Sequence, residues 1–180
     1  MPRLIAFLRA INVGGHTVTM ERLRKEFEGL GFTGVETFIA SGNVIFTSRA
    51  GNPAAIEKKI EARLRQALGF EVATFVRTAA EVAAVAGYQP FTAAQIENGG
   101  AVYIGFVATP LDAAAARAVM SFKTAIDDFH VKGREVYWLR KTRKAASTFS
   151  YVSLEKTLRI RATFRGINTV VRLAAKHGPT

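Results

Sequence analysis

Cysteine is absent from the 180-residue sequence. This absence excludes disulfides, thiolate metal sites, iron–sulfur clusters and cysteine nucleophiles, and a small secreted scaffold usually needs such cross-links. Long apolar runs are missing as well. The first run, Leu4 to Leu8, is followed by Arg9, and later runs are broken by charge or glycine before the roughly 18 residues that a membrane span needs. We therefore expect a cytoplasmic protein with no membrane partner.

Metal-binding patterns are also lacking. His130 and His177 are isolated in the sequence, and no spacing of histidine or carboxylate residues resembles a zinc or calcium site. A structural role is the better interpretation for these two histidines. We expect neither a metal nor a cofactor.

Positive charge is concentrated near the C-terminus. The formal net charge is +11, and residues 1–131 carry 13 Lys and Arg against 12 Asp and Glu, whereas residues 132–180 carry 12 against 2. If these basic residues share one face, they attract phosphates or other polyanions; a solvated surface that only aids solubility is the alternative. The 49% hydrophobic content supplies one sizeable core or two small ones.

Helix and strand signals alternate in the first half of the chain. Apolar residues three or four apart after Thr19 predict an amphipathic helix, and Asn52-Pro53 supplies a cap and a first-turn proline for a second helix. Ser41-Gly42 is typical of a tight turn between two strands. The predicted order is βαββαβ, as in ferredoxin-like units. The expected strands are 3–11, 35–40, 43–48 and 71–77, and the expected helices are 20–30 and 53–68.

The second half repeats this order less clearly. A capping box from Thr78 to Glu81 predicts a connecting helix, and the stretch 88–100 is the best linker candidate. We predict an α+β protein with two ferredoxin-like βαββαβ subdomains in tandem, antiparallel sheets covered by helices, and an extra C-terminal helix. The expected divisions are 1–78 for the first subdomain, 79–100 for the connecting helix and linker, and 101–180 for the second subdomain with the C-terminal helix.

The loop 12–16 joins a buried strand to a helix and contains paired glycines. Backbone amides in such a turn can bind phosphate or carboxylate, although a strained turn that simply needs glycine gives the same pattern. In a βαββαβ unit this loop and the hairpin 41–43 lie at the same end of the sheet, where they supply a cation, amides, a hydroxyl and an imidazole. The predicted ligand-binding residues are Arg9, Asn12, Gly14, Gly15, His16, Ser41, Gly42 and Asn43.

Catalysis at these loops is the weaker interpretation. Ser41 with His16 as its base needs an acid that orients the histidine. Glu36 lies on a strand expected to run away from the hairpin, and neither loop contains an acidic residue. Catalytic residues therefore stay unassigned.

A second candidate surface follows the strand that contains Tyr137 and Trp138. Aromatic rings beside basic residues can stack on bases while the cations hold phosphates. The alternative is that the two rings alternate across a sheet and the basic run is a surface loop. No RNA-recognition consensus is present, so binding to nucleic acid would be largely non-specific. The candidate nucleic-acid contacts are Arg140, Lys141, Arg143, Lys144 and Arg165.

Four segments of the sequence resemble one bacterial family. They are LRAINVGG at 8–15, LGFTGVETFIASGNVIF at 30–46, FVRTAAEV at 75–82 and ATFRGINTV at 162–170. Together they resemble the Domain of Unknown Function 1697 family over almost the whole chain. The resemblance implies a two-part α+β fold and no stated activity. Ala10 stands where the family commonly has glycine, and RGINT stands where it commonly has RNWNT, so Arg165, Asn168 and Thr169 still match.

These patterns favour a binding protein for an anionic ligand, either a nucleotide-like molecule or nucleic acid. An enzyme that acts on a phosphorylated or carboxylated small molecule at the same loops is one alternative. A structural or assembly module whose basic face meets an acidic protein is another.

Overall fold

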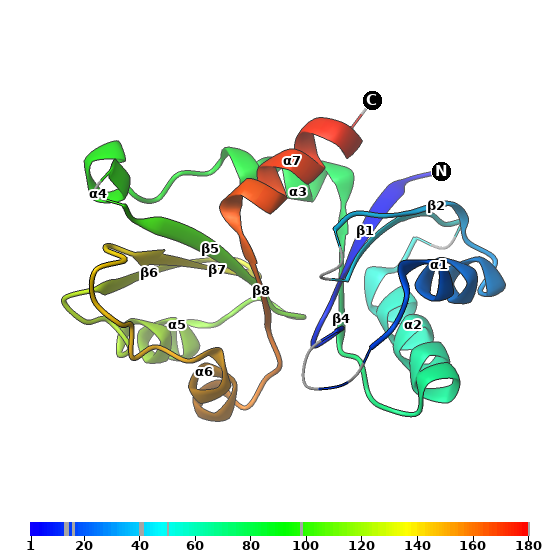
Figure 1. Cartoon of the computed structure of the whole chain (residues 1–180), viewed down its shortest axis with the longest axis horizontal. Coiled ribbons are helices and arrows are strands. Elements are labelled where there is room, and N and C mark those ends of the chain that lie inside the picture. Colours follow the sequence, from blue (N-terminus) through cyan, green and yellow to red (C-terminus); the bar gives the residue numbers. More distant parts are fainter. Residues whose placement is uncertain (13–14, 16, 40–41, 50, 98, 180) are drawn as a thin grey trace. The chain divides into compact units, whose positions relative to one another are not determined.

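The computed structural model describes residues 1–12, 15, 17–39, 42–49, 51–97 and 99–179 (Figure 1). Its backbone forms two compact units, Met1–Ala84 with Leu173–Thr180, and Val85–Arg172. Compactness alone does not define independently folding domains, so the subdomain limits expected from the sequence stay a prediction.

The first unit contains a four-stranded antiparallel sheet and its helices. Its elements are β1 (Arg3–Leu8), α1 (Met20–Gly29), β2 (Thr33–Thr37), β3 (Asn43–Thr47), α2 (Pro53–Leu68) and β4 (Thr74–Thr78), followed by α3 (Ala79–Gly87). The strand order is β2-β3-β1-β4, and each neighbouring pair is antiparallel. This order is that of a ferredoxin-like unit, and it confirms the predicted βαββαβ half.

Local signals determine where these helices begin and end. The side chains of Thr19 and Asn52 each accept a hydrogen bond from a first-turn amide at 3.1 Å, so both predicted N-caps are confirmed. Gly69 ends α2 with a φ of 82°. Thr78 and Glu81 bond reciprocally, at 2.7 and 3.1 Å, which confirms the capping box of α3.

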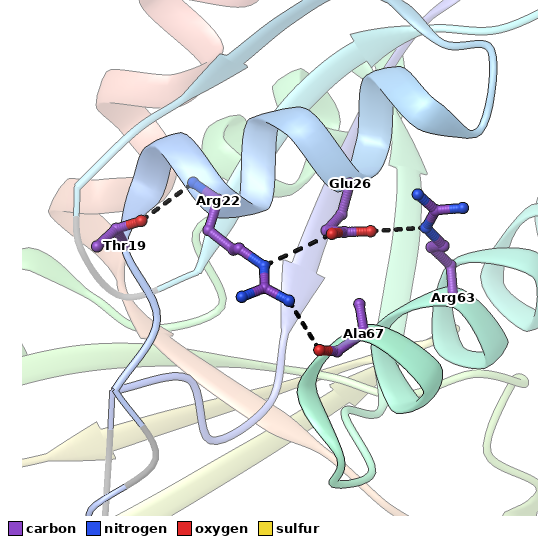
Figure 2. A network of polar contacts seen from close by, with 5 residues as sticks. All are labelled: Thr19, Arg22, Glu26, Arg63 and Ala67. Carbon is purple, nitrogen blue, oxygen red and sulfur yellow. Dashed lines mark hydrogen bonds and ion pairs between the residues drawn. The ribbon is translucent and has the colours of Figure 1, made fainter.

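An ion-pair network joins α1 to α2 (Figure 2). Glu26 Oε2 lies 2.6 Å from Arg63 Nε, and Glu26 Oε1 lies 3.5 Å from Arg22 Nε. Arg22 Nη2 also donates to the Ala67 carbonyl at 2.8 Å. The Glu26 side chain is only 14% exposed, so water screens this pairing less than it screens a fully exposed pair. The network fixes the two helices that cover the apolar face of the first sheet.

The second unit repeats the same architecture. Its elements are α4 (Ala93–Glu97), β5 (Ala101–Phe106), α5 (Ala113–Met120), β6 (Asp127–Lys132), β7 (Glu135–Arg140), α6 (Tyr151–Leu158), β8 (Thr163–Gly166) and the first part of α7 (Ile167–His177), which belongs to the first unit from Leu173 onward. The strand order β6-β7-β5-β8 matches that of the first unit, strand for strand. The tandem α+β fold and the additional C-terminal helix are therefore both present.

The stretch expected to be a linker also forms helix α4. The Thr92 amide donates to Gln95 Oε1 at 2.8 Å, and the Gln95 amide donates to Thr92 Oγ1 at 3.3 Å. Thr-x-x-Gln is a capping box, which explains why the chain turns helical here.

Carboxylates cover the outer edge of β4. Antiparallel pairing with β1 directs alternate amides of β4 away from the sheet. The amides of Thr74, Val76 and Thr78 donate to Glu61, Glu57 and Glu81 at 3.0, 2.9 and 2.7 Å, respectively. In the second unit, Glu155 of α6 accepts from the amide of Ala162, just before β8, at 3.1 Å. Carboxylates of helix residues thus satisfy three amides of β4, whereas in the second half one of them satisfies an amide just before the last strand.

Among the described residues, no helix is long and apolar enough to cross a membrane.

Candidate functional site

The loop after β1 and the hairpin before β3 meet at one end of the first sheet. The Leu8 amide donates to the Gly42 carbonyl at 2.8 Å. A Cβ added at Gly42 would lie 3.1 Å from Leu8 Cβ and 3.2 Å from Ile11 Cβ. The expected convergence of the two connections is therefore present. Three of the predicted ligand-binding residues, Gly14, His16 and Ser41, lie outside the described part of the chain.

Unusual backbone angles gather at this end of the sheet. Ala10, Asn12 and Ile39 all have a φ of 60°, and Gly15 has a φ of 87°. The Asn12 side chain supports its own turn, since Asn12 Oδ1 accepts from the Val18 amide at 2.7 Å. Left-handed backbone costs non-glycine residues energy, and such strain often accompanies functional sites. The strain marks these connections as candidates without defining a ligand.

Two further predicted ligand-binding residues lie partly or wholly inside this end of the sheet. Asn43 is fully buried, and its Nδ2 donates to the Phe38 carbonyl at 2.9 Å, which closes the hairpin. Arg9 is half-buried, and its amide donates to the Ala73 carbonyl at 2.9 Å. Of the predicted set, Asn12 and Gly15 are the described residues that face solvent.

The aromatic pair on β7 packs within the second unit. Tyr137 is buried, and Trp138, on the opposite face, stacks on Tyr103 with centroids 4.6 Å apart. Trp138 Nε1 donates to Asp127 Oδ1 at 2.8 Å. The alternation across the sheet weighed in the sequence analysis is therefore present, and both rings have protein partners.

The basic segment, residues 140–144, continues from β7. Arg140 Nη2 donates to the Ala145 carbonyl at 3.0 Å. Further along, Ser147 Oγ donates to both oxygens of the buried Asp127, at 2.8 and 2.9 Å. Asp127 thus holds the chain on both sides of the segment, at Trp138 before it and at Ser147 after it, while Arg143 and Lys144 are exposed.

Arg165 was expected to contact nucleic acid, but the structure buries it. Only 8% of the residue is exposed, and its Nη1 donates to Thr163 Oγ1 at 2.7 Å and to the Phe164 carbonyl at 3.1 Å. Desolvation by burial lowers the pKa of Arg165 to about 10. Its place beside Ile104 in the register of β5 and β8 puts it on a covered face of the sheet.

A cavity of about 610 Å³ lies in the second unit. Its wall comes from the connection that includes α4, the start of β5, the basic segment, and the junction of β8 with α7. Apolar and aromatic side chains form most of the wall. The polar side chains in it are Tyr88, Gln89, Tyr103, Arg143 and Asn168. This volume and this lining are typical of sites for small molecules.

The cavity combines rings with groups that attract negative charge. Arg143 brings a permanent cation to the wall. Gly166, Ile167 and Asn168 belong to the wall at the start of α7, where first-turn amides have no intrahelical acceptor and carry partial positive charge. The ring of Tyr103 is fixed by its stacking on Trp138. A ligand with a planar part and an anionic group therefore matches this chemistry.

Most residues of this cavity were missed in the sequence analysis. Tyr88, Tyr103 and Asn168 come from segments that are distant in the chain, so no local spacing connects them. A signal existed only for Asn168, which lies in the matched RGINT motif, and for Arg143, which belongs to the predicted basic run. No group of three or more His, Cys, Asp or Glu in the described part of the chain could hold a metal ion.

Comparisons with known proteins bear on the family and the fold. A family model described as "Protein of unknown function (DUF1697)" matches residues 1–137. The solved structure of the conserved bacterial protein SP0830 from Streptococcus pneumoniae is similar over 98% of both chains, with 24% sequence identity and a TM-score of 0.75. At this identity the likeness extends to the fold alone. No curated protein has a sequence that matches the chain.

Proposed function

The chain belongs to the DUF1697 family of proteins of unknown function, and we propose that it binds a small anionic ligand of the nucleotide class in the cavity of its second unit. The observation that carries this proposal is the presence of Arg143 in a wall otherwise dominated by apolar and aromatic groups. A planar base suits the rings, and a phosphate suits the guanidinium.

Charge and helix geometry support the same ligand class. Residues 132–180 hold 12 Lys and Arg against 2 Asp and Glu, so the potential around this part of the chain attracts anions. The start of α7 adds backbone amides to the cavity wall, and phosphate commonly binds at such helix starts. A bare phosphate would leave the apolar wall unused, and a neutral nucleoside would leave Arg143 unpaired.

Calorimetry with AMP, adenosine and inorganic phosphate tests the proposal. We expect AMP to bind more tightly than either fragment. Arg143→Gln should weaken AMP binding by about tenfold or more, because it removes a charge-assisted hydrogen bond to phosphate. Arg117→Gln is the matched control, since Arg117 lies on α5 and is exposed and outside the cavity wall. If both variants lost the same amount of AMP affinity, the effect would come from the net charge of the protein and not from a contact of Arg143. Absence of AMP binding to the wild type would refute the proposal.

Nucleic-acid binding is a second candidate function. It is favoured by one observation: Asp127 anchors the basic segment on both sides of its exposed Arg143 and Lys144. A held loop loses less conformational entropy than a free one when it meets a phosphate backbone. Such binding would depend strongly on salt and little on base sequence.

A further inference from the structure

Tyr88 belongs to the cavity wall but is held from outside the cavity. Its hydroxyl lies 2.8 Å from His130 Nε2, and its ring meets that of Tyr137 edge-on with centroids 5.3 Å apart. Lys132 Nζ lies 3.8 Å from the centre of the Tyr88 ring. His130 and Lys132 are two residues apart on β6, so their side chains lie on the same face of the sheet. His130 lies opposite Tyr137 of β7. The face of β6 and β7 therefore forms a seat for this ring.

The seat matters because the chain leaves helix α3 at Tyr88, whose amide still donates to the Val85 carbonyl at 3.3 Å. The residue follows the end of α3 and precedes α4, in a connection that is neither helix nor strand. This connection and α4 supply a large share of the cavity wall, including Gln89, Pro90 and Ile96. Phe91, which is buried, anchors the far end of the connection. Tyr88 anchors the near end.

We infer that His130 is a positioning residue for the cavity: its hydrogen bond to Tyr88 keeps the connection 88–92 docked on the second sheet and thereby sets the affinity for the ligand. The effect on ligand affinity rests on the proposed function, whereas the docking of the connection on the sheet does not. Neither His130 nor Lys132 belongs to the cavity wall, so His130 acts through Tyr88. A side chain that bonds the hydroxyl without an imidazole, such as glutamine, is sufficient for this role.

Affinity for AMP tests the coupling between the two residues. His130→Ala and Tyr88→Phe should each weaken binding about fivefold, the effect of one hydrogen bond, while His130→Gln should stay within about twofold of wild type. The double variant His130→Ala/Tyr88→Phe should bind no more weakly than either single variant, because both changes remove the same bond. Unchanged affinity in His130→Ala, or losses that add in the double variant, would overturn the inference.

Hydrogen exchange gives a test that needs no ligand. The amides of Gln95 and Gly100 donate to the carbonyls of Thr92 and Ile96, so their exchange rates report whether the connection and α4 stay in place. We expect exchange several-fold faster in His130→Ala than in wild type and His130→Gln, with unchanged rates in α1 of the first unit. Equal rates in all three proteins would overturn the positioning role. Faster exchange together with no AMP binding by wild type would support that role and count against the proposed function alone.

Discussion

Replacing Ala10 with glycine tests whether the loop after β1 carries backbone strain. Ala10 is exposed and has a φ of 60°, a conformation that costs an L-residue about 1–2 kcal/mol and glycine almost nothing. Glycine also gains freedom in the unfolded chain, which removes about 0.4–1 kcal/mol of that benefit. The free energy of unfolding of Ala10→Gly should therefore rise by about 0.5–1 kcal/mol, and the melting temperature by about 1–4 °C for a chain of this size. The family that the sequence resembles commonly has glycine where this chain has Ala10, which agrees with a positive φ at this position.

Urea denaturation and calorimetry provide the measurement, and Ala108→Gly provides the control. Ala108 is also exposed and lies outside helices and strands, but it is not among the residues with positive φ. Glycine there should lower the free energy of unfolding by about 0.4–1 kcal/mol. If Ala10→Gly destabilises the protein as much as Ala108→Gly does, the proposed strain at Ala10 is refuted.

Three further predictions concern other parts of the chain. Gly15→Val should lower the melting temperature more than Gly51→Val, because Gly15 has a φ of 87° and Gly51 has no positive φ; equal melting temperatures would contradict this. Burial lowers the pKa of His177 below its ordinary 6.5, helped by Arg3 and opposed by Glu36, so the unfolded chain binds this proton more readily. Urea denaturation should show stability falling as the pH drops from about 6.5 through the folded pKa of His177, and His177→Phe should remove that dependence; the same slope in both proteins would be contrary evidence. Anisotropy measures the affinity for a labelled single-stranded oligonucleotide, and the logarithm of this affinity should fall against the logarithm of salt concentration with a slope of about 0.7 per phosphate neutralised. The slope should decrease when four basic residues become glutamine. An unchanged slope would show that the basic segment is not the contact. These four residues are Arg140, Lys141, Arg143 and Lys144.

The order of strands and helices was predictable because its signals are local. Caps at Thr19 and Asn52 and the reciprocal pair Thr78 and Glu81 act over three or four residues, and all are present in the structure. The same signal is present at Thr92, with Gln95 three residues later, but glycine and proline nearby favour a linker over a helix in the sequence. The pattern at Thr92 was as complete as the one at Thr78.

The candidate site was less predictable because burial and convergence are not local. The sequence predicts a surface cation at Arg165, since arginine is mostly exposed, but its register beside Ile104 buries it. Asn43 closes the hairpin from inside, which a pattern of polar residues in a turn does not reveal. The cavity joins Tyr88, Arg143 and Asn168 only after the second sheet has formed.

The carboxylates along β4 have a consequence for how copies of this protein can associate. An edge strand with unsatisfied amides is a template on which another chain adds a strand, and this is how many β-proteins aggregate or swap segments. Glu57, Glu61 and Glu81 occupy the outward amides of β4. In the other half, Glu155 occupies the amide of Ala162, just before β8. Growth of the first sheet by strand addition is thus directed away from β4 and toward β2, at the opposite edge.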